Sequence, residues 1–340
     1  MNEILRVENL NVTFKRKKAN IQAVRGTSFF VTEGETLAIV GESGSGKSVT
    51  AKSIMGMIPK STSLATDGKV MFKGKSLLES SKKELEHIRG SEIGMIFQDP
   101  MTALNPTMKI GKQIDEVLIK NKKVSRKEAK EQTINLLKMV GISDPSKRYS
   151  EYPHEFSGGM RQRVVIAMAI ACNPSLIIAD EPTTALDVTI QAQILNLLET
   201  IQEKNRSSII LITHDLGVVA EVADRVAVMY GGMIVESGKV EDIFERPKHP
   251  YTWGLLQSVP KLTSEKKERL VPIEGAPPDL ADPPLGCAFA PRCPYAMGVC
   301  IEHLPDEEFF SADHVSRCWL NDERAPKPHS LKAPGREQYV

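Results

Sequence analysis

Residues 41–48 constrain the fold of this chain more strongly than any other segment. Their sequence, Gly-Glu-Ser-Gly-Ser-Gly-Lys-Ser, matches every required position of the phosphate-binding loop pattern. The apolar run 36–40 precedes this loop, and a helical stretch at residues 48–57 follows it before Pro59. A Gly/Ser-rich linker, the alternative interpretation, would lack this flanking strand and helix. The sequence therefore predicts a strand, loop and helix that together bind the phosphates of a nucleotide.

The residue types in this loop suit contacts with phosphate and magnesium. Glycines let backbone N–H groups point at phosphate oxygens, and the following helix adds the positive end of its dipole. We expect Lys47 to contact the β- and γ-phosphates and Ser48 to reach Mg²⁺. The predicted nucleotide-binding residues of the loop are Gly41, Ser43, Gly44, Gly46, Lys47 and Ser48.

A second predicted strand ends in two carboxylates. The apolar residues 176–179 are followed directly by Asp180 and Glu181. In open α/β sheets, ligands bind outside the carboxyl ends of the strands. A carboxylate there can hold Mg²⁺ through water, and its neighbour can orient or deprotonate the attacking water, so we assign these roles to Asp180 and Glu181 respectively. An acidic pair that only faces solvent is the alternative, but the loop upstream favours the functional interpretation.

The order of predicted elements indicates an α/β fold. Apolar strands at residues 175–179 and 208–212 lie on either side of a predicted helix at 188–204. Such alternation favours a doubly wound parallel sheet covered by helices. Residues from about 100 to 160 are richer in helical signals, and we interpret them as a helical subdomain inserted into this core.

Two domains are predicted along the chain. Residues 1–250 form the nucleotide-binding domain, which includes the inserted helices. Residues 251–340 form a small C-terminal module that is dense in proline and carries four of the five cysteines. The last residues of this module have the polar, proline-rich composition of a tail.

Charge and hydrophobicity argue against several classes of protein. Lys and Arg number 44 against 43 for Asp and Glu, so the net charge of +1 does not indicate a basic surface for nucleic acid. Residues 1–11 lack the basic start and apolar run of a secretory signal. The longest apolar stretch, residues 164–172, is shorter than the ~20 residues that span a bilayer. We therefore expect a cytoplasmic protein that reaches a membrane only through a partner.

The segment at residues 156–162 narrows the family. Its sequence, Phe-Ser-Gly-Gly-Met-Arg-Gln, resembles the signature motif of ABC ATPases, and it precedes Asp180 at the distance that this family shows. A serine and two glycines before a long helix form a second anion-binding helix start. The resemblance implies that Ser157, Gly158 and Gly159 close over ATP bound to an opposite subunit. One subunit alone would then hold an incomplete active site.

Four single residues match further positions of the ABC ATPases by order and spacing. Gln98 is similar to the glutamine that touches Mg²⁺ and the nucleophilic water and relays the nucleotide state to the membrane subunits. His214 resembles the switch histidine that contacts the γ-phosphate, and Asp187 resembles the loop residue that crosses the dimer interface. Phe14 lies where the family places an aromatic ring that stacks on adenine, although a Phe in a β-hairpin is often a core residue.

Two further runs make the resemblance more specific. Residues 98–106 and 246–252, with the cysteine-bearing end, look like the ATPases of oligopeptide and dipeptide importers of the peptide/nickel transporter family, and the similarity covers nearly the whole chain. Phe156 and Met160 replace the commoner Leu and Gln of the general signature. The resemblance implies a peripheral protein on the cytoplasmic face of the cell membrane, where ATP hydrolysis powers peptide import.

The same resemblance implies several partners. They are a second ABC ATPase subunit, often non-identical, two membrane-spanning permease subunits, and an extracytoplasmic peptide-binding protein that acts through the permease. ATP binding would close the two ATPase subunits on each other, and hydrolysis would reset them. No nucleic acid is expected in this assembly.

Other functions stay open. A non-transport ABC ATPase acting on nucleic acid usually carries two ATPase cores or a long coiled-coil insertion, and neither fits this sequence. An importer of another solute, such as nickel, would share these motifs, because the membrane and binding subunits supply most of the specificity. A redox-regulated interaction subunit is a third possibility, but the intact catalytic set argues against it.

The cysteines near the carboxyl end suggest a bound metal. They are Cys287, Cys293, Cys300 and Cys318. A small module with little regular structure needs a cross-link such as a disulfide or a bound metal, and disulfides are not expected in a reducing compartment. Structural zinc usually shows closely spaced Cys pairs, which are absent here, so the spacing leaves an iron–sulfur cluster, zinc and unligated thiols open. The resemblance to importer ATPases implies a 4Fe–4S cluster, with zinc as the alternative.

Overall fold

The structure is a computed structural model that describes residues 2–16, 19–59, 63–184, 186–258 and 272–326. The chain divides into two compact units whose segments alternate along the sequence. The first unit comprises residues 1–4, 32–34 and 79–212, and the second comprises 5–31, 35–78 and 213–340. Two parts of the predicted C-terminal module, residues 259–271 and 327–340, lie outside the described residues.

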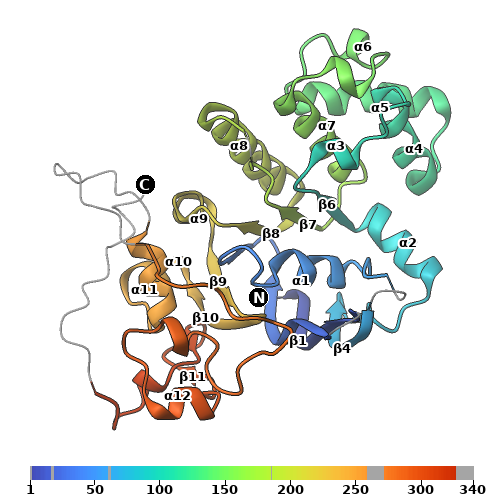
Figure 1. Ribbon diagram of the computed structural model, residues 1–340. Coiled ribbons are helices and arrows are strands. Elements are labelled where there is room, and N and C mark those ends of the chain that lie inside the picture. Colours follow the sequence, from blue (N-terminus) through green and yellow to red (C-terminus); the bar gives the residue numbers. More distant parts are fainter. Residues whose placement is uncertain (1, 17–18, 60–62, 185, 259–271, 327–340) are drawn as a thin grey trace, which may run out of the picture. The chain divides into compact units, whose positions relative to one another are not determined.

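Three parallel strands form the sheet of the first unit (Figure 1). They are β6 (Ile93–Ile96), β7 (Leu176–Asp180) and β8 (Ser208–Thr213). In the parallel pairings, Ile93 lies opposite Leu176 and Leu176 lies opposite Ser208. Every residue of these strands is buried, as expected for a parallel sheet with helices on its faces. The predicted strands at 175–179 and 208–212 correspond to β7 and β8.

Helices make up most of the remaining first unit. They are α2 (Lys82–Ser91), α3 (Pro100–Ala103), α4 (Ile110–Lys122), α5 (Arg126–Met139), α6 (Pro145–Arg148), a 3₁₀ turn (Pro153–Glu155), α7 (Gly158–Ile170) and α8 (Val188–Asn205). Helices α4, α5 and α7 pack on one another. Asp115 of α4 is buried and accepts hydrogen bonds from the hydroxyls of Thr133, at 2.8 Å, and Tyr149. This network ties α4 to α5 and to the end of α6.

The strands of the second unit form two groups. One is an antiparallel sheet in the order β2 (Ile21–Thr32), β1 (Glu3–Phe14), β4 (Ser63–Phe72) and β5 (Lys75–Ser76). In the other, β3 (Thr36–Val40) pairs in parallel with β9 (Arg225–Tyr230), with Leu37 opposite Arg225. Antiparallel strands continue from β9 through β10 (Met233–Lys239) and β12 (Val315–Ser316) to β11 (Glu308–Phe309).

Short helices and turns complete the second unit. They are α1 (Lys47–Ile54), α9 (Leu216–Val222), α10 (Val240–Glu245), α11 (Pro250–Gln257), α12 (Gly298–Glu302) and the 3₁₀ turns η2 (Ala290–Arg292) and η3 (Trp319–Asn321). The predicted helix at residues 48–57 is α1, but it ends earlier than expected. Gly56 takes a left-handed backbone with φ 57°, which stops the helix before Pro59 can do so.

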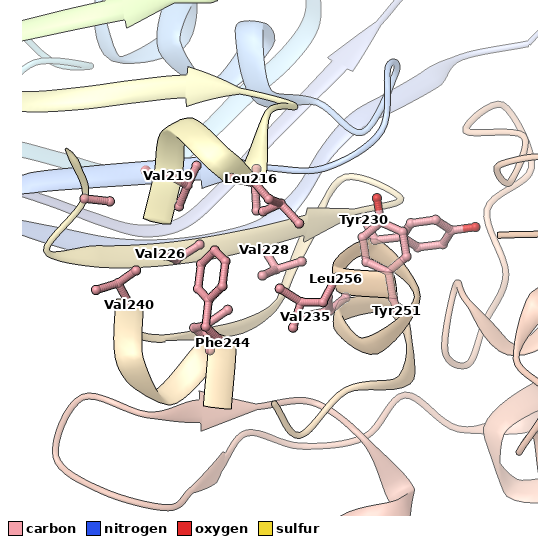
Figure 2. Close-up of a cluster of buried hydrophobic side chains, with 14 of the residues drawn as sticks. Leu216, Val219, Val226, Val228, Tyr230, Val235, Val240, Phe244, Tyr251 and Leu256 are labelled. Atoms are coloured by element: carbon pink, nitrogen blue, oxygen red, sulfur yellow. The ribbon is translucent and has the colours of Figure 1, made fainter. Parts of the chain in front are cut away.

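A buried apolar cluster holds the second unit together (Figure 2). It joins Val228 of β9 and Val235 of β10 to Phe244 of α10 and Tyr251 of α11. Phe289, which lies between two of the cysteines, belongs to the same cluster. The cysteine-bearing segment therefore shares a core with the strand pair that contains β3, the strand before the phosphate-binding loop.

Helices of the described residues are all too short or too polar to cross a membrane. The longest, α8, has 18 residues and carries Glu199, Glu203 and Lys204.

Candidate functional site

Two glycines of residues 41–48 make room for the loop. A Cβ atom added to Gly41 would lie 2.1 Å from the carbonyl oxygen of Met229, and one added to Gly46 would lie 2.4 Å from that of Ala23. Gly46 also has φ 105°, a backbone conformation that other residues rarely adopt. Gly41 has φ 150°, so both positions require glycine for steric and for backbone reasons.

The side chain of Lys47 folds back across the phosphate-binding loop. Its Nζ group donates hydrogen bonds to the carbonyl oxygens of Gly41, at 2.7 Å, and Glu42, at 3.0 Å. The side chain is only 5% exposed, so its ammonium group stays beside the backbone of the loop. This position lets one cation serve both the loop and an anion bound in it.

The start of α1 suits an anionic ligand. Gly46 is the N-cap and offers no side chain to the first N–H groups of α1. The hydroxyl of Ser45 is buried and lacks a hydrogen-bond partner within the described residues. Helix N–H groups that no side chain caps and an unsatisfied buried hydroxyl both gain from a phosphate oxygen. The loop therefore fits the phosphates of a nucleoside triphosphate.

Glu181 follows β7 and is held by polar contacts within the first unit. Its Oε2 accepts hydrogen bonds from Nε2 of Gln98, at 2.8 Å, and from the hydroxyl of Thr184, at 2.9 Å. Its backbone N–H donates to the carbonyl oxygen of Ile212 in β8 at 2.9 Å. Glu181 has φ 47°, an uncommon value for a residue other than glycine, and such strain persists where the surroundings enforce it.

Asp180 and Gln98 lie at the same edge of the parallel strands as Glu181. Asp180 is the last residue of β7 and is 3% exposed, while Gln98 follows β6 by two residues. Because β6 and β7 run in parallel, their carboxyl ends meet at one edge. Three of the residues that the sequence singled out are thus brought together, with a direct hydrogen bond between Gln98 and Glu181.

The signature segment lies beside the start of α8. Ser157 is the N-cap of α7, and its hydroxyl accepts the N–H of Met160 at 3.3 Å. Asp187 is the N-cap of α8, and its carboxylate accepts the N–H of Ile190 at 2.9 Å. A Cβ on Gly159 would lie 3.0 Å from the Cγ2 methyl of Ile190. The two helix starts are therefore neighbours in the first unit, and Ser157 and Gly158 are exposed.

Two predicted residues belong to the second unit, as the phosphate-binding loop does. His214 is exposed and precedes Asp215, whose carboxylate accepts the N–H groups of Gly217 and Val218 at the start of α9. Phe14 is the half-buried last residue of β1 and lies opposite Ser63 in the antiparallel sheet. Asp180, Glu181 and the signature segment belong to the first unit.

The four cysteines near the carboxyl end lie in one neighbourhood. The backbone N–H of Cys287 donates to the carbonyl oxygen of Cys300 at 2.8 Å. Burial, with a smaller contribution from the nearby sulfurs of the other cysteines, raises the pKa of Cys293 to about 11 and that of Cys318 to about 12. All four are free thiols in the structure.

The donor chemistry of these thiols fits a soft metal or an iron–sulfur cluster, since such groups are held by thiolates. Within the described residues, however, the structure forms no group of three or more His, Cys, Asp or Glu side chains arranged to hold a metal ion. Ligation would require the thiols to lose their protons and draw together.

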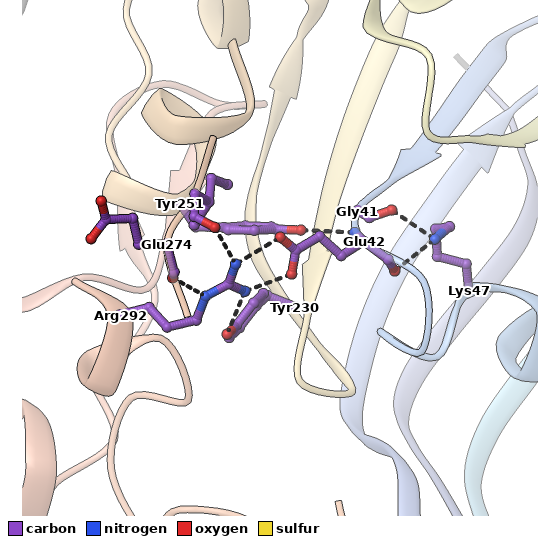
Figure 3. A network of polar contacts seen from close by, with 8 residues as sticks. Gly41, Glu42, Lys47, Tyr230, Tyr251, Glu274 and Arg292 are labelled. Carbon is purple, nitrogen blue, oxygen red and sulfur yellow. Dashed lines mark hydrogen bonds and ion pairs between the residues drawn. The ribbon is translucent and has the colours of Figure 1, made fainter. Parts of the chain in front are cut away.

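Some contacts of the site were not predicted. Thr184 supports Glu181, and its short spacing from that residue is the only signal in the sequence. Arg292 forms an ion pair with Glu42 of the phosphate-binding loop, although 250 positions separate them (Figure 3). No local pattern connects these two residues, so sequence reasoning could not have found the pair.

Comparisons with known proteins match two family models to this chain. The model described as ABC transporter matches residues 24–184. The model described as the oligopeptide/dipeptide transporter C-terminal region matches residues 235–300. The two matches cover the phosphate-binding loop, the signature segment, β7 and three of the four cysteines.

Several curated relatives are similar over nearly the whole chain. The oligopeptide transport ATP-binding protein OppD of Bacillus subtilis (strain 168) is 57% identical over 98% of this chain and 94% of its own length. The dipeptide transport ATP-binding protein DppD of the same strain is 57% identical over 96% of this chain and 97% of its own. The Lactococcus lactis DppD is 53% identical over 96% of this chain and 93% of its own.

Solved structures share the fold of about 70% of the chain. The dimeric post-hydrolysis state of the ATP-binding cassette MJ0796, bound to ADP and Pi, gives a TM-score of 0.63 at 28% identity, covering 69% of this chain and 98% of that one. The structure of cbiO1 from Clostridium perfringens gives 0.61 at 30% identity, covering 72% and 91%.

Proposed function

This chain belongs to the ABC transporter family, in its oligopeptide and dipeptide branch, and we infer that it is the subunit whose ATP hydrolysis powers peptide import. The geometric observation that carries this function is the position of Glu181. Its carboxylate lies at the end of β7, next to Asp180, and is oriented by Gln98 and Thr184. A carboxylate held in this way can accept a proton from an attacking water.

The proposed roles divide the chemistry among the predicted residues. Lys47 binds the β- and γ-phosphates of ATP, while Ser48, Gln98 and Asp180 serve Mg²⁺, which neutralises charge on the transferred phosphoryl group. Glu181 activates the water, and His214 contacts the γ-phosphate. The backbone of the phosphate-binding loop and the ring of Phe14 hold the remainder of the nucleotide.

The active site is proposed to be completed by a second ABC ATPase subunit. Support comes from Ser157 and Gly158, which are exposed at the start of α7, and from the neighbouring Asp187. A helix start attracts phosphate, and the start of α7 carries Ser157 and Gly158 at the surface, where a second subunit can reach them. Each subunit would therefore offer its signature segment to ATP held by the other.

The wider assembly follows from this role. Two permease subunits would span the membrane, an extracytoplasmic binding protein would deliver the peptide to them, and this chain would attach to their cytoplasmic face. Segments near Gln98 would relay the nucleotide state to the permease, because Gln98 contacts Glu181 and is followed by the short, exposed α3.

A 4Fe–4S cluster bound by Cys287, Cys293, Cys300 and Cys318 is proposed as a structural cofactor, with zinc as the alternative. The shared neighbourhood of these thiols in a segment with little regular structure supports it. Anaerobic purification followed by iron, sulfide and zinc analysis tests it. About four irons per chain with a broad visible absorption band would support the cluster. A preparation that contains no iron and no zinc would refute both assignments.

The function is tested with the complete transporter in membrane vesicles. Peptide delivered with its binding protein should stimulate ATP hydrolysis by the wild-type complex, and Glu181→Gln should abolish that stimulation. Stimulation by nickel instead of peptide would assign a different solute. Stimulation by nucleic acid, with no response to either solute, would contradict a transport function.

A further inference from the structure

A polar network joins the cysteine-bearing segment to the phosphate-binding loop. The segment itself contains none of the nucleotide-binding motifs. Arg292 holds the carboxylate of Glu42 in a two-pronged ion pair, with Nη1 2.6 Å from Oε2 and Nη2 2.9 Å from Oε1 (Figure 3). The Arg292 side chain is 5% exposed and that of Glu42 is 27% exposed. Two parallel bonds between planar groups fix direction as well as distance.

The other contacts of Arg292 hold its guanidinium in this orientation. Its Nε donates to the carbonyl oxygen of Glu274 at 2.8 Å, and its Nη2 donates to that of Ile273 at 3.0 Å. Nη1 also donates to the hydroxyl oxygen of Tyr230 at 3.2 Å. A guanidinium held by five bonds loses little further freedom when it positions Glu42. The anchor is therefore made by residues of this chain alone.

Glu42 transmits this anchoring to the loop through its backbone. Its N–H donates to the hydroxyl oxygen of Tyr251 at 2.8 Å, and its carbonyl oxygen accepts from Nζ of Lys47 at 3.0 Å. The aromatic rings of Tyr230, Tyr251 and Phe289 pack on one another with centroids 4.4 to 5.3 Å apart. The side chain, the N–H and the carbonyl of Glu42 are thus all fixed, two of them by residues outside the loop.

The negative charge of Glu42 makes its ion pair with Arg292 important for the binding of an anionic ligand. A carboxylate in a loop that receives phosphate groups repels them unless a cation neutralises it. Arg292 supplies that cation from within the second unit, leaving the charge of Lys47 for the ligand. Arg292 also immediately precedes Cys293, so the residue that holds the loop lies within the segment that carries the thiols.

We propose that Arg292 is a positioning residue for ATP: through Glu42 it sets the shape and the charge of the phosphate-binding loop, and it thereby couples the cysteine-bearing segment to nucleotide affinity. This inference rests on the proposed function, since it assumes that the loop binds ATP. Arg292 acts through another residue and is assigned no contact with the nucleotide.

The test measures binding of MgATP to the full-length chain by calorimetry. Arg292→Ala should weaken binding about ten-fold, because it leaves the Glu42 carboxylate unneutralised and the loop without its anchor. Arg292→Lys keeps the charge but loses the two-pronged geometry, so its affinity for MgATP should lie between those of the wild-type chain and Arg292→Ala. This variant replaces Arg292→Ala in the test if the alanine variant does not fold. Arg317→Ala is the matched control: Arg317 likewise adjoins a cysteine and pairs with Glu307 at 2.9 Å, but it does not contact the loop.

A second-site variant separates positioning from a general loss of structure. In a Glu42→Gln background the effect of Arg292→Ala should shrink to less than about two-fold, because the repulsive charge is gone. A purely structural role of Arg292 would give the same loss in both backgrounds and would overturn the proposal, as would wild-type affinity in Arg292→Ala. Failure of the wild-type chain to bind MgATP would instead refute the proposed function.

Discussion

Nε2 of Gln98 donates a hydrogen bond of 2.8 Å to Oε2 of Glu181, joining residues that lie 83 positions apart. The amide comes from the segment after β6, and the carboxylate follows β7, the strand beside it. In the proposed function, Gln98 reports to the membrane subunits and Glu181 activates water. A direct bond between them means that movement of one reorients the other.

Replacing the proposed base should separate binding from hydrolysis. Glu181→Gln keeps the size of the side chain and its contacts with Gln98 and Thr184, but it cannot take a proton from water. We expect the rate of ATP hydrolysis to fall about 10³-fold, within the range for loss of a general base, with MgATP affinity little changed. Phosphate release and calorimetry on the same preparation measure both. Hydrolysis within ten-fold of wild type would remove Glu181 from the role of base.

The hydrogen bond between Gln98 and Glu181 can be tested by removing its donor, the side-chain amide of Gln98. Gln98→Ala removes one of the hydrogen bonds to Oε2 of Glu181 and keeps that of Thr184, so the carboxylate should lose part of its orientation. We expect hydrolysis to fall by roughly ten-fold, and peptide stimulation to fall further. Peptide-stimulated and basal hydrolysis by the complete transporter give the two values. Equal losses in both would show that Gln98 supports catalysis without relaying a signal.

The steric requirement at Gly46 predicts a sharp contrast between two glycines. A Cβ at Gly46 would lie 2.4 Å from a backbone oxygen, whereas one at Gly74, in the turn between β4 and β5, meets nothing within 4 Å. Both residues have positive φ, 105° and 77°, so an alanine would strain the backbone at either position. Gly46→Ala should abolish detectable MgATP binding, and Gly74→Ala should cost only about 1 kcal/mol of stability. Retained binding in Gly46→Ala would contradict the loop geometry.

Burial of His249 predicts a dependence of stability on pH. Its ring is buried, its Nδ1 accepts the N–H of Tyr251 at 3.0 Å, and burial lowers its pKa to about 3. The unfolded chain binds a proton at His249 below its ordinary pKa of about 6.5, while the folded chain stays neutral down to about 3. The contribution to stability is therefore full above about pH 6.5 and is lost as the pH falls towards 3, by up to about 1.4 kcal/mol per pH unit.

A variant isolates this contribution. His249→Asn keeps a side-chain acceptor at the N-cap of α11 but removes the titrating group. Urea unfolding from about pH 7.5 down to about pH 5 should show a shallower loss of stability in the variant than in the wild-type chain. Identical slopes would mean that His249 does not drive the acid sensitivity.

The sequence predicted those parts of the site whose residues are consecutive or lie at strand ends. The loop at residues 41–48, the Asp180–Glu181 pair and the strands before them follow from patterns that span a few positions. The end of α1 was misplaced because a left-handed Gly56 stops the helix before Pro59 does. A local pattern does not predict where a helix ends when two residues, here Gly56 and Pro59, can each end it.

Contacts between distant segments could not be predicted in this way. The Arg292–Glu42 pair depends on how the cysteine-bearing segment packs against β9 and α11, which no local pattern encodes. The same holds for the thiols, whose spacing left several ligands open. Two of them, Cys287 and Cys293, pack against the apolar cluster that contains Phe289, and such tertiary packing is not encoded in a local motif.

The central claim is that ATP hydrolysis by this chain powers peptide import. Its most direct test is uptake of a labelled oligopeptide by cells that carry either the wild-type chain or Glu181→Gln in the complete transporter. We predict ATP-dependent accumulation with the wild-type chain and background uptake with the variant at equal protein levels. Equal accumulation in both, or no peptide uptake by the wild-type complex under conditions where it hydrolyses ATP, would contradict the account.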